Sequence, residues 1–218
     1  MKLVVIAKEP VPGRVKTRLS PPCSAGQAAA IAEAALADTL EAVAAVEADE
    51  RVLVLEGRPG AWVPPGLRVI AQRGGGLDER LASAFEDVGG PALLIGMDTP
   101  QVTPAVLVGA CRLLATDGVD AVLGAATDGG WWAVGLRAPD RRAFVGVPMS
   151  TPDTARAQRA HLSSLGLRVE TLPALRDVDT WDDALVVADL APATRFAAAV
   201  RGVAAHVGDR ALMPGAVG

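Results

Sequence analysis

Residues 3–19, LVVIAKEPVPGRVKTRL, join a short apolar run to a basic loop. The run at 3–7 is rich in β-branched residues and is followed by proline and glycine, which is typical of a buried strand in a parallel sheet. Ligands of open α/β sheets bind beyond the carboxyl ends of the strands, where Lys and Arg suit phosphate oxygens. The loop therefore predicts a phosphate-binding site, with a solvated charged turn as the alternative. Its cations, which face a single carboxylate, are Lys8, Arg14, Lys16 and Arg18.

The composition limits the class of protein. The chain has 218 residues, 50% apolar and 21% charged, which is the balance of a soluble globular domain with a sizeable core. The net charge of -4 argues against nucleic-acid binding, so the basic loop is directed at a small anion. Two cysteines are too few for a disulfide framework and favour a reduced, cytoplasmic setting. We expect no membrane span and no secretory signal, because the apolar runs are too short.

Short apolar segments alternate with helical patterns along the chain. We expect strands at 3–7, 51–56, 67–71, 92–96, 120–125, 131–136 and 168–171, and helices at 24–47, 77–88, 104–116, 151–165, 180–190 and 192–203. This alternation predicts an α/β, Rossmann-like fold with a mostly parallel central sheet and helices on both faces. We expect one domain over 1–203 and a flexible tail over 204–218.

Three aspartates are candidate metal ligands. Asp98 follows the apolar run at 92–96, and Pro100 bends the chain away, so its carboxylate is expected at the sheet edge beside the basic loop. Asp177 and Asp179 alternate in an extended segment and project the same way. Mg²⁺ or Mn²⁺ needs few protein carboxylates and otherwise takes phosphate oxygens and water. The alternative for Asp179 is a helix cap before Thr180.

Two glycine-containing stretches are candidate ligand contacts. Asp128, Gly129 and Gly130 predict a tight turn whose backbone amides approach a substrate, beside a planar wall supplied by Trp131 or its neighbour. The turn alone accounts for these glycines equally well. In the glycine run at 74–76, Gly75 is a candidate phosphate contact, as is Arg80 in the helix that follows; a surface role for that arginine is as well supported. The run lacks dinucleotide spacing, and no P-loop is present.

Five motifs together resemble a known group of proteins. In chain order they are KEPVPGRVKTRL (8–19), QRGGGLDERLASAF (72–85), IGMDTPQVTP (95–104), TDGGWWAVGL (127–136) and RDVDTWDDAL (176–185). They resemble a bacterial family of small GT-A-type glycosyltransferases that includes the arsenosugar-pathway type. More distantly, the KTRL and DVDT segments are similar to phospholactate guanylyltransferases and to molybdenum-cofactor and sugar nucleotidyltransferases.

The resemblance implies a nucleotide-diphospho-sugar transferase fold. In such folds the loop after the first strand holds the nucleotide phosphates, and a strand-end aspartate, here Asp98, coordinates a divalent metal together with a late one, Asp177 or Asp179. The chain departs from the family at 76–78, where GLD replaces the usual DLG, and at Thr99, where a cysteine is usual. The first departure puts a polar contact of the glycine-rich loop in doubt.

These observations predict a Mg²⁺-dependent transferase in which Lys16, Arg18 and Asp98 are catalytic. Glycosyl transfer from a nucleoside-diphosphate sugar to a small acceptor ranks first, on the resemblance. Nucleotidyl transfer from a nucleoside triphosphate to a phosphorylated acceptor, with release of pyrophosphate, ranks close behind because of the four cations. A non-catalytic nucleotide-binding subunit is the third hypothesis. A homodimer is compatible with the sequence.

Overall fold

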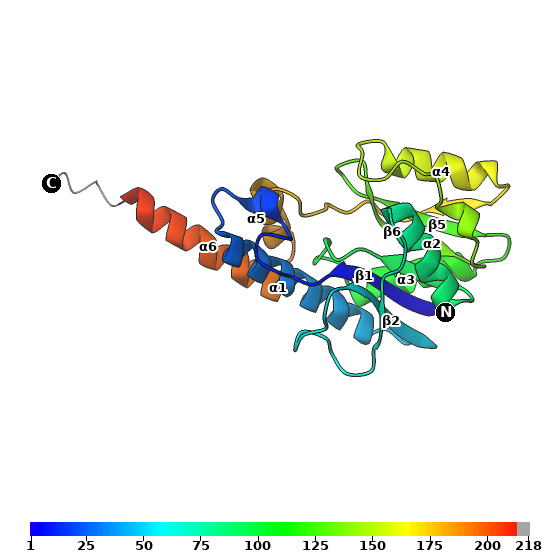
Figure 1. Cartoon of the computed structure of the whole chain (residues 1–218), viewed down its shortest axis with the longest axis horizontal. Helices are drawn as coiled ribbons and strands as arrows, with labels where there is room; N and C mark the ends of the chain where they lie inside the picture. Colours follow the sequence, from blue (N-terminus) through cyan, green and yellow to red (C-terminus); the bar gives the residue numbers. More distant parts are fainter. Residues whose placement is uncertain (213–218) are drawn as a thin grey trace.

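The computed structural model describes residues 1–212, which form a seven-stranded sheet between helices (Figure 1). The strand order is β3-β2-β1-β4-β6-β5-β7, and only β6 runs antiparallel to its neighbours, β4 and β5. The predicted α/β fold with a mostly parallel sheet is thereby confirmed. The strands are β1 (Lys2–Lys8), β2 (Glu50–Glu56), β3 (Arg68–Ala71), β4 (Ala92–Ile95), β5 (Ala121–Ala125), β6 (Trp131–Leu136) and β7 (Val169–Thr171).

Capping residues set the starts of several helices. At the first helix, the backbone N–H of Gln27 donates to Ser24 Oγ at 3.3 Å and that of Ser24 donates to Gln27 Oε1 at 2.8 Å, which is a capping box. At the third, Thr103 caps and Pro104 occupies the first turn. The helices are α1 (Ala25–Ala44), α2 (Leu77–Val88), α3 (Pro104–Ala115), α4 (Thr154–Ser164), α5 (Trp181–Leu190) and α6 (Arg195–Leu212), with short 3-10 turns η1 (Thr17–Leu19) and η2 (Arg141–Ala143).

Alternate residues of the central strands serve two separate cores. Leu3 and Val5 of β1 face the core that α1 and α3 cover, whereas Val4 faces the core of α2, η2 and α4. In the second core the rings of Phe85 and Phe144 stack with centroids 5.0 Å apart. Because both faces of the sheet are covered, ligands reach it only at its edges.

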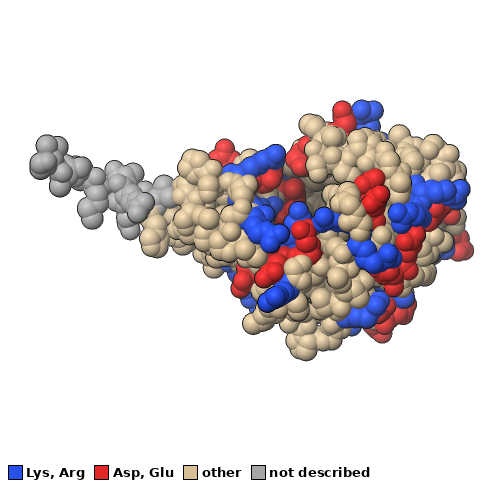
Figure 2. All heavy atoms as spheres, in the orientation of Figure 1, with Lys and Arg blue, Asp and Glu red and all other residues tan. Residues whose placement is uncertain are grey.

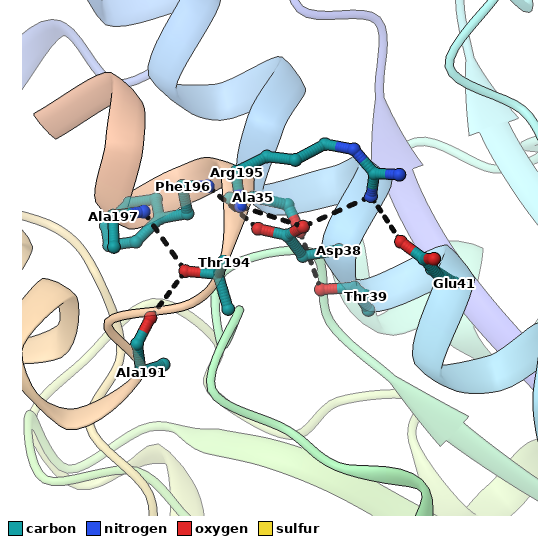
Figure 3. A network of polar contacts seen from close by, with 9 residues as sticks. All are labelled: Ala35, Asp38, Thr39, Glu41, Ala191, Thr194, Arg195, Phe196 and Ala197. Atoms are coloured by element: carbon teal, nitrogen blue, oxygen red, sulfur yellow. Dashed lines mark hydrogen bonds and ion pairs between the residues drawn. The ribbon is translucent and has the colours of Figure 1, made fainter. Parts of the chain in front are cut away.

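A third apolar cluster joins α1 to α5 and α6, away from the sheet (Figure 1). Here Asp38 of α1, whose side chain is 8% exposed, accepts hydrogen bonds from the backbone N–H groups of Arg195 (3.2 Å) and Phe196 (2.8 Å), as Figure 3 shows. The first backbone donors of a helix have no partner within the helix, so Asp38 caps α6 from a neighbouring helix. Arg195 also pairs with Glu41.

Several helix boundaries differ from the sequence expectations: α1 ends at Ala44 rather than at 47, the last helix begins at Arg195 rather than at 192, and two further boundaries differ for local reasons. The helix expected from 151 begins at Thr154, because the backbone N–H of Thr151 donates to Thr154 Oγ1 at 2.9 Å in a turn that precedes the helix. The last helix, expected to end at 203, continues to Leu212 because 204–212 contains several strong helix formers. The boundary of the expected tail therefore falls inside α6, and its remainder, 213–218, lies outside the described residues. None of the described helices has the length and apolar character needed to cross a membrane.

Candidate functional site

A pocket of about 260 Å³ lies at the carboxyl edge of the sheet. The parallel strands β1 and β4 pair Val5 with Ile95, so the basic loop and the segment after β4 emerge side by side. Figure 2 shows basic and acidic side chains gathered around a hollow in this face. The structure thus brings all four predicted cations together with two of the three aspartates. The pocket is lined by Lys8, Arg14, Val15, Lys16, Thr17, Arg18, Met97, Asp98 and Asp179.

Lys16 occupies the centre of this charge arrangement. Its ammonium Nζ lies 2.6 Å from Asp98 Oδ1 and also donates to the carbonyl of Val178, and 10% of the side chain is exposed. Burial lowers the pKa of Lys16, but the charges of Asp98, Asp177 and Asp179 outweigh burial and raise this pKa above its ordinary value. Lys16 also has a left-handed backbone, with φ 48° and ψ 38°, which is uncommon outside glycine.

Asp177 lies in a cluster of carboxylates. Burial, then the negative charge of Asp98 and smaller contributions from Asp128 and Asp179, raise the pKa of Asp177 to about 8, while Lys16 opposes the shift. Asp177 is therefore mainly protonated at neutral pH, because burial and the acidic neighbours together outweigh the one ammonium group. A further cation at this position would favour the ionised form.

Backbone and side-chain hydrogen bonds hold the late aspartate segment against the loop that follows β4. The N–H of Val178 donates to the carbonyl of Asp98 at 3.0 Å, and Gln101 Nε2 donates to the carbonyl of Arg176 at 2.6 Å. On its other side the segment bonds to the turn before β6, where the N–H of Thr127 donates to the carbonyl of Leu175 at 3.0 Å. Residues far apart in the sequence are thereby fixed around one site.

The cations of the loop differ in how far they are already paired. Lys16 pairs with Asp98, and Arg18, 74% exposed, pairs with Asp179. Lys8 lies 3.7 Å from Glu56, which also pairs with Arg80. Among the side chains that the structure describes, those of residues 1–206, Arg14 forms no ion pair. Arg14 and the loosely held Lys8 are thus the cations most open to an anionic ligand, and both also line an adjoining pocket of about 110 Å³.

Only two of the three aspartates predicted to bind a divalent metal are suitably placed to do so. In the described part of the chain, no three or more His, Cys, Asp or Glu side chains are placed to hold one ion, and Asp179 instead pairs with Arg18. The expected set of three aspartates is therefore not preformed. Asp98 and Asp177 do fit, because both supply hard oxygen donors and a bound cation would offset the charge of Asp98 that disfavours ionisation of Asp177. Mg²⁺ usually binds one or two carboxylates and completes its shell with phosphate and water.

The glycine run contributes less than the sequence predicts. Gly75 lines neither pocket, and its N–H donates to Glu79 Oε2 at 2.8 Å. Arg80 pairs with Glu56 and donates to Gln72 at 3.3 Å, so it reaches the site only through Glu56. Neither residue has a geometry that supports direct contact with phosphate.

The turn before β6 lies beside the acidic cluster but outside both pockets. Asp128 Oδ1 accepts the N–H of Gly130 at 2.8 Å, which closes the predicted turn. Gly129 has a φ of +92°, and a Cβ there would lie 1.8 Å from the carbonyl oxygen of Pro152. The close approach is thus to another loop of this chain. Trp131 packs on the α2 side of the sheet with its indole N–H buried and unpaired.

Some residues at the site were missed by the sequence analysis. Glu56 ends β2 directly opposite Lys8 in the register, so the rule that ligands lie beyond strand ends applies to it equally. Gln101, which bonds to the carbonyl of Arg176, could be linked to the site from the sequence only by its place three residues after Asp98. Met97 lines the pocket and accepts the N–H of Lys8 at 3.3 Å through its sulfur.

Solved structures with a similar fold include nucleotide-dependent transferases. A protein from Desulfovibrio desulfuricans G20, provisionally described as a nucleotide-diphospho-sugar transferase, is 25% identical over 93% of this chain and 97% of that chain, with a TM-score of 0.76. A CMP:2-keto-3-deoxy-manno-octonic acid synthetase solved with CTP is 14% identical over 88% and 98%, with a TM-score of 0.56. Rv0371c from Mycobacterium tuberculosis H37Rv, solved with manganese, is 21% identical over 86% and 97%, with a TM-score of 0.50.

The same comparisons confirm the predicted nucleotide-diphospho-sugar transferase fold, although the two more distant structures share the fold alone. No curated protein matches the chain. One family profile, described as "Uncharacterized protein conserved in bacteria (DUF2064)", matches residues 30–151, which is more than half of the chain. The chain therefore belongs to the DUF2064 family of bacterial proteins.

Proposed function

We propose that this protein is a divalent-metal-dependent transferase that binds an activated nucleotide with its phosphates in the pocket of the basic loop. The observation that carries the proposal is the position of Lys16, whose side chain extends from that loop to the carboxylate of Asp98 and lies near Asp177. A site that combines cations open to phosphate with paired carboxylates suits a metal-bound polyphosphate.

The residues at the site divide the work between binding and charge compensation. Arg14, which is not engaged in an ion pair, receives phosphate oxygens through its planar fork, and Lys8 adds a second positive charge. Asp98 and Asp177 would hold Mg²⁺ or Mn²⁺. When bound, that ion neutralises charge that develops on the phosphate leaving group. Arg18 lies at the exposed rim of the pocket, where it pairs with Asp179 and adds positive charge for phosphate binding.

Transfer of a sugar from a nucleoside-diphosphate sugar is the reaction that we place first. The description of the Desulfovibrio protein supports it. Nucleotidyl transfer is the second candidate, because four cations in one loop suit a triphosphate.

Product analysis distinguishes the two reactions. Purified protein with Mg²⁺ is incubated with nucleoside triphosphates and nucleotide sugars and a panel of small acceptors. Nucleoside diphosphate release indicates glycosyl transfer, and pyrophosphate release indicates nucleotidyl transfer. Asp98→Asn should lower kcat by about 100-fold or more while the protein still binds nucleotide. The matched control is Asp87→Asn, which removes a carboxylate that pairs with Arg73 outside the pocket and should retain activity.

The outcome also tests the non-catalytic alternative. Nucleotide binding without turnover, in the wild type and in Asp98→Asn with every acceptor, contradicts the transferase proposal and favours a binding subunit. Failure to bind any nucleotide contradicts both hypotheses.

A further inference from the structure

The ammonium group of Lys16 contacts a carboxylate oxygen of Asp98 that a bound metal ion would need as a ligand. Asp98 Oδ1 contacts Nζ at 2.6 Å, and the same Nζ donates to the carbonyl of Val178. The side chain is largely buried, and its nearest charged groups are carboxylates. Lys16 therefore balances the negative charge of Asp98 in the free protein, as a bound metal ion otherwise would.

A divalent ion that binds Asp98 approaches this ammonium group closely. Metal–carboxylate distances are about 2.1 Å for Mg²⁺, so the two cations would be separated by about 4 Å, where the repulsion is large even at an effective dielectric constant of about 20. Lys16 must then leave the carboxylates, and a buried ammonium group needs another anionic partner when it does so. Lys16 also lines the pocket, so phosphates bound there lie within reach of its flexible side chain.

We propose that Lys16 competes with the divalent metal for Asp98, so that metal binding depends on nucleotide phosphates that accept the displaced ammonium group. This inference rests on the proposed function, because it assumes a metal-bound nucleotide at this site. It assigns to Lys16 a role in the order of binding, in addition to phosphate contact. The free protein holds metal weakly, and metal and nucleotide bind together.

Direct metal titration tests the inference without any turnover. Binding of Mn²⁺ is measured by electron paramagnetic resonance of the free ion, in the absence of nucleotide, for the wild type, Lys16→Met and Arg18→Met. Arg18 is the matched control, because it lies in the same loop and also pairs with an aspartate, Asp179, but is exposed. We expect Lys16→Met to bind Mn²⁺ at least about tenfold more tightly than the wild type, and Arg18→Met to change affinity by less than about threefold.

Several results would overturn the inference. One is equal Mn²⁺ affinity for Lys16→Met and the wild type; another is an equal gain in Arg18→Met, which would indicate the general charge of the pocket. Circular dichroism verifies folding, and Lys16→Gln replaces Lys16→Met if that variant does not fold. A repeat with UDP, CDP, GDP and ADP separates the two proposals. If no variant binds Mn²⁺ even with a nucleotide, the proposed function fails as well; if the wild type alone already binds tightly, only the inference fails.

Discussion

Gly129→Ala tests whether the glycine turn before β6 serves packing or ligand binding. The added Cβ would lie 1.8 Å from the carbonyl oxygen of Pro152 and 2.5 Å from its carbonyl carbon, and φ is +92°. Backbone atoms cannot move aside as a flexible side chain does, so the loop before α4 must shift. Left-handed strain of about 1 kcal/mol and overpacking of about 1–3 kcal/mol together predict a loss of about 2–4 kcal/mol in unfolding free energy.

The neighbouring Gly130 supplies a matched control. The three atoms nearest to a Cβ there belong to the Asp128 side chain, with Oδ1 at 3.1 Å, and the φ of Gly130 is not positive, so Gly130→Ala should cost less than about 1 kcal/mol. Urea unfolding gives both free energies, and thermal unfolding should show a decrease in Tm of about 4–16 °C for Gly129→Ala. Equal stability of Gly129→Ala and the wild type, with weakened substrate binding, would refute the packing argument and restore the predicted role in ligand approach.

Two further predictions concern stability away from the pocket and at its acidic cluster. Asp38→Ala removes the acceptor that caps α6 and should lower the free energy of unfolding, measured in urea, by about 2 kcal/mol. Glu41→Ala removes the exposed partner of Arg195 and should cost less than about 0.5 kcal/mol. Similar losses in the two variants would contradict the capping role. The pKa of Asp177 is raised to about 8, so the folded state holds a proton that the unfolded state releases near pH 4, and stability from this group falls as pH rises from about 4 to about 8. Urea unfolding at about pH 5.5 and pH 8 should show a larger loss for the wild type than for Asp177→Asn, and parallel losses would contradict the shift.

The order of the elements could be read from the sequence because local signals agreed with the final packing. Ser24 with Gln27, and Thr103 before Pro104, start α1 and α3 where predicted. The start of α4 was placed too early because the pattern Ser-Thr-Pro resembles a cap, while Thr151 in fact bonds Thr154 in a preceding turn. Such competition between alternative hydrogen bonds of one hydroxyl depends on tertiary context.

The sequence predicted where the residues of the candidate site lie better than which ion pairs they form. The strand-end rule located the basic loop and Asp98 together, because β1 and β4 are parallel neighbours. It gave no means to decide that Arg80 would turn to Glu56, or Asp179 to Arg18. The close approach at Gly129 was likewise expected, but its partner, Pro152, lies in a loop whose path the sequence does not specify.

The pairing pattern bears on which reaction the site performs. Four cations counted in the sequence favour a triphosphate, yet Lys16 and Arg18 are already balanced by aspartates, so Arg14 and Lys8 remain for the ligand. Each phosphate of a nucleoside-diphosphate sugar carries one negative charge, whereas a terminal phosphate carries nearly two. Two open cations balance the two phosphate charges of the first ligand before the metal and Lys16 are counted. A triphosphate carries about two further negative charges, which only the metal and the released Lys16 are left to balance, and so the charge balance of the free protein supports placing glycosyl transfer first.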